Sequence, residues 1–454
     1  MTVVGLAKSG IAAARLLRQE GATVRATDAK TAEQLGPEVS ALQKEGVTLF
    51  LGGHPDECLA GADLVVTSPG VPENAKPLAW AASHGVEVIG ELELAWRLLP
   101  KTIRVIAITG SNGKSTTTAL TGHLLAEAFG GAAVWVGGNI GRPLSDFLTS
   151  DFERLPDWAV VEVSSFMLET APTFAPHIAA ILNVSANHLD RHPTLQAYAE
   201  IKARIWKNAT SDSWTVFNRD DAMVASLAAR APGRKASFGA GTAAANGAGF
   251  VWTPASSSAT VRFANGPESY SLDRFPAPGA HNAANAAAAI LMARLAGANA
   301  AAIEPALATF RPLEHRLEKC GEARGVRFYN DSKATTSEAL GKSIAVFPKS
   351  VVLAGGKDKG GDFKALGSLF KERVKKLVTF GTAKDLIADA LAGTTAIVRT
   401  PDLPAAFAEA TKDLSAGDVV LFSPACASYD QFANFEERGK AFKKLAASWV
   451  EAHA

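Results

Sequence analysis

Apolar and polar positions along this chain follow two alternating patterns. In one, short apolar runs end in glycine or polar residues, which predicts strands. In the other, apolar residues recur every three or four positions, as they do from Ile11 to Leu17, which predicts helices with one buried face. Apolar strands that alternate with helices favour parallel, doubly wound α/β sheets. The predicted strands lie at 2–6, 22–28, 63–71, 103–110, 158–164, 178–184, 326–331, 350–356, 376–381 and 418–425.

These elements fall into three successive segments, so we expect three domains. Residues 1–91 are predicted to form a Rossmann-like domain with a glycine turn after its first strand. Residues 92–311 form a central α/β segment, in which the stretch 239–260 predicts hairpins and the alanine-rich stretch from His281 predicts a helix. Residues 312–454 are predicted to form a second Rossmann-like domain. A chain of 454 residues is too long for one ordinary core.

The composition argues against several classes of protein. Lys and Arg number 46 and Asp and Glu 45, so no overall positive field attracts nucleic acid or anionic lipid. Cys58, Cys320 and Cys426 are far apart and lack CxxC spacing, so neither disulfides nor structural zinc is expected. The chain shows no signal-like start and no apolar run long enough to span a bilayer. We expect a cytoplasmic monomer with no nucleic-acid partner and no membrane insertion.

The segment TGSNGKST carries the clearest chemistry. Its glycines let backbone N–H groups converge on phosphate, and a helix begins directly after it. Lys114 would reach the β- and γ-phosphates of ATP, and the Ser115 hydroxyl would ligate Mg²⁺. The loop is shorter than the usual GxxxxGK[ST], and an ordinary glycine turn with a surface lysine is the alternative. The preceding strand favours a P-loop mononucleotide-binding domain. The residues expected to bind ATP here are Gly110, Ser111, Asn112, Gly113, Lys114, Ser115 and Thr116.

Acidic and histidine residues follow the next two strands. Glu162 lies near the carboxyl end of its strand, where ligands of α/β sheets bind. His188 and Asp190 follow the next strand, and both residue types bind metals. A lone histidine there is more often structural, but with Glu162 and the phosphate loop it suggests a second metal position. Lys202, within a predicted helix, would by itself be interpreted as a solvated charge.

Eight segments in order resemble the Mur ligases of peptidoglycan synthesis, and the resemblance covers essentially the whole chain. GSNGKS is shared by these ligases and by folylpolyglutamate synthase. NDSKAT and SPACASYDQFANFEERG are much more specific to the ligase that adds glutamate. The resemblance implies that ATP converts the carboxylate of UDP-N-acetylmuramoyl-L-alanine to an acyl phosphate, which D-glutamate then attacks. The segments are TGSNGKST, VEVSSFMLE, ILNVSANHLDRH, AEIKARIWKNA, GAHNAAN, EHR, NDSKAT and SPACASYDQFANFEERG.

The resemblance also implies roles for single residues in ATP and metal binding. Ser115, Glu162, His188 and Lys202 would hold two Mg²⁺ ions, with Lys202 carbamylated by CO₂. A carbamate turns the cation into an oxygen-donor anion that suits Mg²⁺. The third domain would have to close onto the central one for its residues to reach ATP. The further ATP contacts would be Asn282, Asn285, Arg316 and Asp331, and the catalytic residues would be Lys114, His188, Lys202 and Lys333.

Two substrate pockets are implied in the same way. One pocket would bind glutamate, a dicarboxylate that needs ammonium and hydroxyl donors. The other would bind the UDP-substrate. The turn GLAKSG resembles a dinucleotide-binding turn with one glycine replaced, and a purely structural turn is equally consistent with this motif alone. The glutamate pocket would comprise Lys333, Thr335, Lys359, Ser428 and Phe435, and the UDP-substrate pocket Lys8, Ser9, Gly10, Ser68, Asn139 and Ser164.

Three residues depart from the family pattern, and several alternatives stay open. Met167 stands where the family usually has Gln, Asn187 where it has Asp, and Glu314 where it has Pro. Another Mur-type ligase, a folylpolyglutamate synthase or a variant specific for L-glutamate would share most of these features. A different class is an NAD(P)-binding redox or regulatory protein that uses the GLAKSG turn and Asp28. A non-catalytic nucleotide-binding module would leave the polar residues of the third domain without use.

Overall fold

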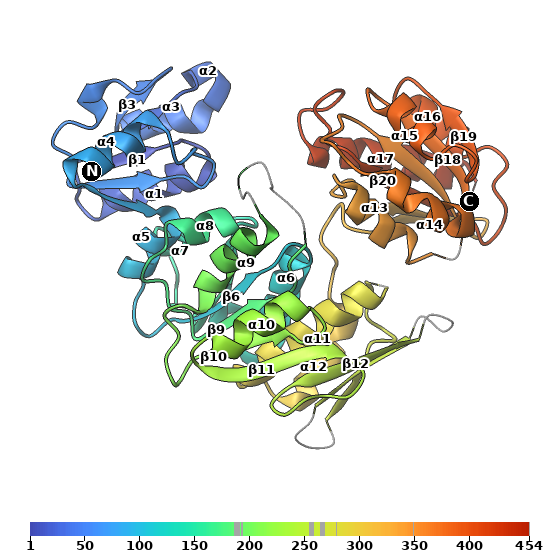
Figure 1. Cartoon of the computed structure of the whole chain (residues 1–454), viewed down its shortest axis with the longest axis horizontal. Coiled ribbons are helices and arrows are strands. Elements are labelled where there is room, and N and C mark those ends of the chain that lie inside the picture. Colours follow the sequence, from blue (N-terminus) through green and yellow to red (C-terminus); the bar gives the residue numbers. More distant parts are fainter. Residues whose placement is uncertain are drawn as a thin grey trace. The chain divides into compact units, whose positions relative to one another are not determined.

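The computed structural model contains three β-sheets with helices packed against them (Figure 1). It describes residues 1–185, 191, 194–253, 258–263, 268–277, 279–347 and 349–453. The chain divides into two compact units. The first unit, Met1–Arg274 with Asn282–Phe310, holds two of the sheets, and the second, Phe275–His281 with Arg311–Ala454, holds the third.

The first sheet has five parallel strands in the order β3-β2-β1-β4-β5. Helix α1 packs on it through Ile11, Leu16 and Leu17, as the sequence pattern predicts. Gly10 is required at the start of this helix, because a Cβ there would lie 1.8 Å from the Gly5 carbonyl oxygen. The elements are β1 (Thr2–Val4), α1 (Lys8–Gln19), β2 (Arg25–Asp28), α2 (Ala32–Leu35), α3 (Pro37–Lys44), β3 (Thr48–Leu51), β4 (Leu64–Thr67), α4 (Lys76–His84), β5 (Glu87–Gly90) and α5 (Glu91–Leu98).

The central sheet has nine strands in the order β14-β13-β12-β11-β10-β9-β6-β8-β7. Its strands are parallel from β7 to β12, but β12, β13 and β14 pair antiparallel. The hairpin that the sequence predicts for the glycine-rich stretch is confirmed, because β12 and β13 pair antiparallel at this edge of the otherwise parallel sheet. The strands are β6 (Arg104–Thr109), β7 (Val134–Gly138), β8 (Trp158–Glu162), β9 (Ile178–Ile181), β10 (Trp214–Asn218), β11 (Arg234–Ala240), β12 (Ala248–Thr253), β13 (Ser258–Phe263) and β14 (Ser269–Ser271).

The buried strands of this sheet bring their carboxyl ends together. Strands β6, β8 and β9 are almost completely buried, which explains why their sequences are continuous apolar runs. In the register, Ile108 pairs with Glu162 and Thr109 with Ile181, so the segments after these strands start at one edge. The helices around the sheet are α6 (Lys114–Phe129), α7 (Ser145–Leu148), α8 (Ser165–Glu169), α9 (Leu195–Ala203), α10 (Ala222–Arg230), α11 (Ala280–Leu295) and α12 (Ala300–Thr309).

The third sheet, in the second unit, has six strands in the order β15-β16-β20-β17-β18-β19. Among these described strands, the pair β15–β16 is antiparallel and the other pairs are parallel. No helix among the described residues is both long and apolar enough to cross a membrane. The elements are β15 (Glu318–Ala323), β16 (Val326–Asn330), α13 (Ser337–Ile344), β17 (Ser350–Gly355), α14 (Gly367–Arg373), β18 (Val374–Phe380), α15 (Lys384–Ala390), β19 (Ala396–Arg399), α16 (Leu403–Ala410), β20 (Val419–Ala425) and α17 (Phe435–Ala452).

Candidate functional site

The predicted phosphate loop joins strand β6 to helix α6 through a backbone that favours glycine. Gly113 has φ 85°, in the left-handed region, and caps the helix. A Cβ at this position would lie 2.3 Å from the Asn285 Oδ1 atom. The side chain of Asn285 also donates to the Asn282 Oδ1 atom at 3.3 Å, and both residues are buried. Helix α11 therefore brings the two predicted nucleotide-side asparagines to the loop.

Lys114 begins helix α6 and turns back over the loop. Its Nζ atom donates to the carbonyl oxygens of Gly110 at 2.9 Å and Ser111 at 3.0 Å. These carbonyls hold the ammonium at the loop, where a triphosphate would need a positive charge. The strand, loop and helix context that the sequence predicted is confirmed.

Lys202 is the most deeply buried cation of this site among the described residues. It is 1% exposed, donates to the Gly110 carbonyl oxygen at 3.1 Å, and lies 4.3 Å from the centre of the Tyr198 ring. Burial, and after it the charge of Lys114, hold the pKa of the Lys202 ammonium well below its usual value, while Glu162 opposes them. The interpretation of Lys202 as a solvated helix charge is therefore wrong.

Glu162 ends strand β8 and is only 2% exposed. Its Oε1 atom accepts a hydrogen bond from the Asn139 side chain at 2.7 Å, whereas its buried Oε2 atom has no hydrogen-bond partner among the described residues. Burial of a carboxylate oxygen without a partner is costly, and a bound cation would offset this cost. Oxygen donors such as this carboxylate and the buried Ser115 hydroxyl suit Mg²⁺. The predicted residues therefore fit one magnesium ion.

The second predicted metal position falls on residues that the structure does not describe. His188, Asn187 and Asp190 lie outside the described ranges. Within those ranges, no group of three or more His, Cys, Asp and Glu side chains could hold a metal by itself.

The N-terminal turn predicted for the UDP-substrate is held by two side chains. The Ser68 hydroxyl donates to the Gly5 carbonyl oxygen at 2.7 Å, and the Asp28 Oδ2 atom accepts from the Leu6 N–H at 2.7 Å. Lys8 and Ser9 occupy the first turn of α1, where Lys8 is exposed and Ser9 is partly buried. The Asp28 carboxylate, on which an NAD(P)-binding interpretation depends, thus already supports the turn.

Two other residues predicted for this substrate have structural partners in the central domain. Asn139 is exposed but donates to Glu162, and its own N–H donates to the Glu162 carbonyl oxygen at 2.8 Å. The Ser164 hydroxyl caps helix α8 by accepting from the Met167 N–H at 3.3 Å. The Met167 side chain is 4% exposed and packs in the apolar core. This departure from the family pattern therefore contributes to packing.

In the second unit, Asp331 follows strand β16 and is built into the fold. Its carboxylate accepts from the hydroxyls of Ser343 at 2.5 Å and Ser423 at 3.0 Å, and from the Leu317 N–H at 3.2 Å. Burial raises the pKa of Asp331 to about 6, while these hydrogen bonds and the charge of Arg316 oppose the shift. Asp331 and Arg316 are therefore electrostatically coupled.

Lys333 and Phe435, both predicted for the glutamate pocket, are in contact. The Lys333 Nζ atom lies 3.7 Å from the centre of the Phe435 ring, a cation–π geometry. Of the other predicted residues, Ser428 is buried, Thr335 is partly buried and Lys359 is exposed. The structure therefore brings together a cation and an aromatic ring that lie about a hundred residues apart in the sequence.

Arg438, which the sequence reasoning missed, organises this region. It is fully buried, and its guanidinium donates to Ser332 Oγ at 3.1 Å, Ser332 O at 2.8 Å and Cys426 O at 3.0 Å. It thus joins the segment that carries Lys333 to the one that precedes Ser428. Burial lowers the pKa of Arg438 to about 10, which leaves it charged. Its position near the start of helix α17, among charged residues, gave no sign of this burial.

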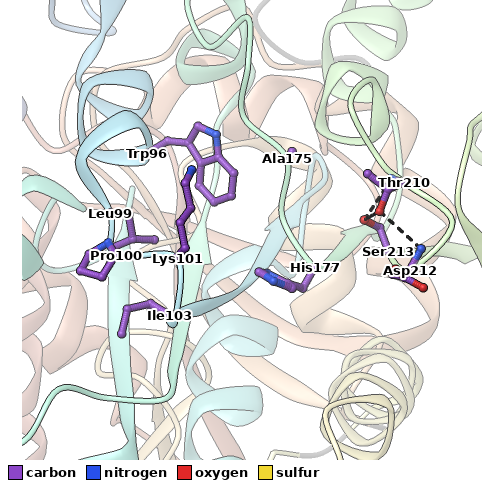
Figure 2. Close-up of a pocket in the computed structure, with 10 residues that line it drawn as sticks. All are labelled: Trp96, Leu99, Pro100, Lys101, Ile103, Ala175, His177, Thr210, Asp212 and Ser213. Carbon is purple, nitrogen blue, oxygen red and sulfur yellow. Dashed lines mark hydrogen bonds between the residues drawn. The ribbon is translucent and has the colours of Figure 1, made fainter.

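A cavity of about 350 Å³ lies away from the phosphate loop, and Figure 2 shows the residues that line it. Its lining comes from the segments before strands β6, β9 and β10, at the opposite ends of these strands from the loop. Its polar groups have protein partners: the Ser213 hydroxyl accepts from the Thr210 N–H, Asp212 pairs with Arg234, and His177 Nδ1 accepts from a backbone N–H. The lining residues are Trp96, Leu99, Pro100, Lys101, Ile103, Ala175, His177, Thr210, Asp212 and Ser213.

Family models match three consecutive parts of the chain. A Mur ligase MurD-like N-terminal domain matches residues 1–90, a Mur ligase middle domain residues 108–293, and a Mur ligase glutamate ligase domain residues 315–426. A protein of Acidobacterium capsulatum called UDP-N-acetylmuramoylalanine--D-glutamate ligase is 42% identical over 464 residues, which cover 100% of this chain and 98% of that protein. A protein of the same description from Anaeromyxobacter dehalogenans is 44% identical over 98% of this chain and 97% of its own.

Solved structures share the fold at low sequence identity. UDP-N-acetylmuramate-alanine ligase MurC of Thermotoga maritima has a TM-score of 0.63 at 20% identity, over 99% of each chain. MurF ligase of Thermotoga maritima, solved in complex with ADP, has a TM-score of 0.61 at 18% identity, over 88% of this chain and 92% of that chain. At these identities, the likeness establishes the common fold.

Proposed function

This chain belongs to the Mur ligase family, and we propose that it joins D-glutamate to UDP-N-acetylmuramoylalanine with the energy of ATP. One observation carries the proposal: the Lys114 and Lys202 ammonium groups both donate to the Gly110 carbonyl oxygen at the phosphate loop. Relatives that match the whole chain have this activity in their names, and the glutamate ligase domain model matches the second unit. The reaction is a cytoplasmic step of peptidoglycan synthesis.

The chemistry follows from the weakness of a carboxylate as an acyl donor. The carboxylate of UDP-N-acetylmuramoylalanine attacks the γ-phosphorus of ATP, ADP leaves, and an acyl phosphate forms. The amine of D-glutamate then attacks the acyl carbon, and the tetrahedral intermediate expels phosphate. Lys114 neutralises negative charge that develops on the transferred phosphoryl group.

Magnesium would be held by Ser115, Glu162, His188 and a carbamylated Lys202. When bound, the ions would neutralise the phosphate oxygens and polarise the bond that breaks. The structure of Lys202 supports carbamylation, since only a neutral amine adds to CO₂ and the pKa of this buried amine is lowered. In this step the amine nitrogen bonds to the carbon of CO₂ and releases one proton. The resulting carbamate adds the negative oxygen donors that a magnesium ion prefers.

The second unit would bind the amino acid. Lys333 offers an ammonium that the Phe435 ring holds by cation–π contact, and Ser428 adds a buried hydroxyl position. An ammonium and a hydroxyl suit the carboxylates of glutamate. Thr335 and Lys359 complete the proposed pocket, and Arg316 and Asp331 would contribute to ATP binding.

The first sheet would bind the UDP group. Gly10 and the first turn of α1, with Lys8 and Ser9, would take the diphosphate, since a helix N-terminus favours anions. Ser68 shapes this turn from the neighbouring strand. We assign residues 1–91 to the UDP-substrate domain, 92–311 to the ATP domain and 312–454 to the amino-acid domain.

A panel of amino acids tests the proposal. The protein is incubated with ATP, Mg²⁺ and UDP-N-acetylmuramoylalanine plus one amino acid at a time, and the product mass is measured. Only D-glutamate is expected to give a product with stoichiometric phosphate release. A product with L-alanine, a diamino acid or L-glutamate would replace the proposal with another amide ligase. Full activity of a Lys114→Ala variant would exclude the proposed phosphate chemistry.

A further inference from the structure

The segment after strand β9 holds the phosphate loop, and one residue of this segment, Asn183, has no part in the proposed mechanism. Its carbonyl oxygen accepts from the Ser111 N–H at 2.9 Å. Its side-chain Oδ1 accepts from the Asn112 N–H at 2.8 Å, and its Nδ2 donates to the Asn112 carbonyl oxygen at 3.0 Å. One amide side chain thus binds both sides of a single loop residue, which fixes the orientation of the adjoining peptide groups.

Neighbouring contacts make this attachment rigid. The Ser111 hydroxyl donates to the Ser185 carbonyl oxygen at 3.1 Å and accepts from the Ser185 N–H at 2.9 Å. The segment is anchored in turn by Asp221, whose Oδ2 accepts from the Val184 N–H at 2.8 Å and whose Oδ1 caps helix α10. The phosphate loop is therefore supported by the segments that follow the two adjacent strands β9 and β10.

These bonds decide which donors the loop can offer. The N–H groups of Ser111 and Asn112 are directed to Asn183, and a phosphate could take them only by breaking those bonds. Because the first N–H groups of a helix have no intrahelical acceptor, the start of helix α6 offers backbone donors to phosphate beside the Lys114 ammonium. Through their own N–H groups Ser111 and Asn112 shape the loop, and a contact of either residue with ATP stays a prediction.

We propose that Asn183 is a positioning residue, which holds the phosphate loop so that the start of helix α6 receives the phosphates. This inference rests on the proposed binding of ATP at the loop. Because these hydrogen bonds of Asn183 are made to the phosphate loop, its loss should weaken nucleotide binding and leave the UDP-substrate domain unaffected.

Calorimetric titration of an Asn183→Ala variant with a non-hydrolysable ATP analogue and Mg²⁺ tests the inference. We expect the nucleotide Kd to rise roughly tenfold, the usual effect of losing buried hydrogen bonds, and the Kd of UDP-N-acetylmuramoylalanine to stay within about twofold. Asn208→Ala is the matched control, because the Asn208 side chain also donates to two backbone carbonyls, those of Pro172 and Phe174. It should lower thermal stability without changing either Kd.

The possible results separate this inference from the proposed function. Unchanged nucleotide affinity in Asn183→Ala overturns the role of Asn183, and so does equal weakening for both ligands. A wild-type protein that binds no nucleotide overturns the proposed function as well. If the variant does not fold, amide exchange in the wild type decides: the Ser111 and Asn112 amides should be protected without nucleotide. Rapid exchange at these two amides would also overturn the inference.

Discussion

The Lys202 ammonium donates to the carbonyl oxygen of Gly110 at 3.1 Å, at the start of the phosphate loop. The same oxygen accepts from Lys114 at 2.9 Å, so two cations share one acceptor. Burial, and after it the charge of Lys114, lower the pKa of the Lys202 ammonium. The fold thus keeps a buried amine of lowered pKa next to the nucleotide loop.

Replacement of Lys202 by methionine should abolish catalysis without unfolding the protein. We expect kcat to fall by at least roughly 100-fold, because the oxygen donors of the carbamate are lost. Melting temperature should not fall, since the methionine removes a buried polar group. In the wild type, ¹³C-labelled bicarbonate should give a carbamate carbonyl signal in NMR that the variant lacks. Lys207→Gln, an exposed lysine nearby, is the control and should retain both activity and signal.

Gly113→Ala should impair nucleotide binding through the loop geometry. Gly113 has φ 85°, and its Cβ would collide with Asn285 Oδ1 at 2.3 Å. Gly130, at the other end of the same helix, has φ 92° but no described atom within 4 Å of its Cβ position. Both variants should lose about 1–2 kcal/mol of stability from the backbone conformation. Only Gly113→Ala should raise the nucleotide Kd, by roughly tenfold or more; equal Kd values in the two variants would contradict this account.

Glu91 predicts a specific pH dependence of stability. It is fully buried, its Oε1 accepts from the Ser145 N–H at 2.6 Å, and burial raises its pKa to about 7 from 4.5. Because the folded state binds the proton more tightly, stability decreases as pH rises from about 4.5 to about 7. Glu91→Gln should be more stable than the wild type at about pH 8, by on the order of 3 kcal/mol. The difference between the two melting temperatures should nearly vanish at about pH 4; a difference independent of pH would exclude this cause.

Phe435→Leu should weaken the binding of glutamate in particular. The leucine removes the ring that lies 3.7 Å from Lys333 Nζ, so the ammonium loses its cation–π contact. We expect KM for D-glutamate to rise roughly fivefold to 30-fold, which corresponds to about 1–2 kcal/mol, with KM for ATP unchanged. Trp449→Leu, on the same helix, removes a ring contact with Phe328 and should affect stability alone. A parallel rise in KM for ATP would indicate a general structural effect of Phe435→Leu.

The positions of the buried strands could be predicted from the sequence, because strands buried on both faces are continuous apolar runs. The hairpin edge at β12–β14 was anticipated only as loops and hairpins, and its antiparallel pairing breaks the parallel pattern. The order of the parallel strands, such as β6 between β9 and β8, depends on partners distant in the sequence, which periodicity does not specify.

In the candidate site, too, some features could be predicted from the sequence and others depend on contacts between distant segments. The glycines and Lys114 are local features, because a turn followed by a helix carries its own sequence signature. The burial of Lys202 and the role of Asn183 depend on contacts between the loop and segments 92 and 71 residues away, which no local pattern connects. Arg438 was missed because a buried arginine has the same sequence signal as an exposed one.

The sequence by itself determined the strand and helix periodicity, the phosphate loop and the family of this protein, since these depend on neighbouring residues and on motif order. Only the tertiary structure decided that Lys202 is a buried amine, that Glu162 keeps one oxygen without a partner among the described residues, and that Asn183 takes the first two loop donors. Burial and hydrogen-bond partners are properties of packed surfaces, and packing is set by the whole fold.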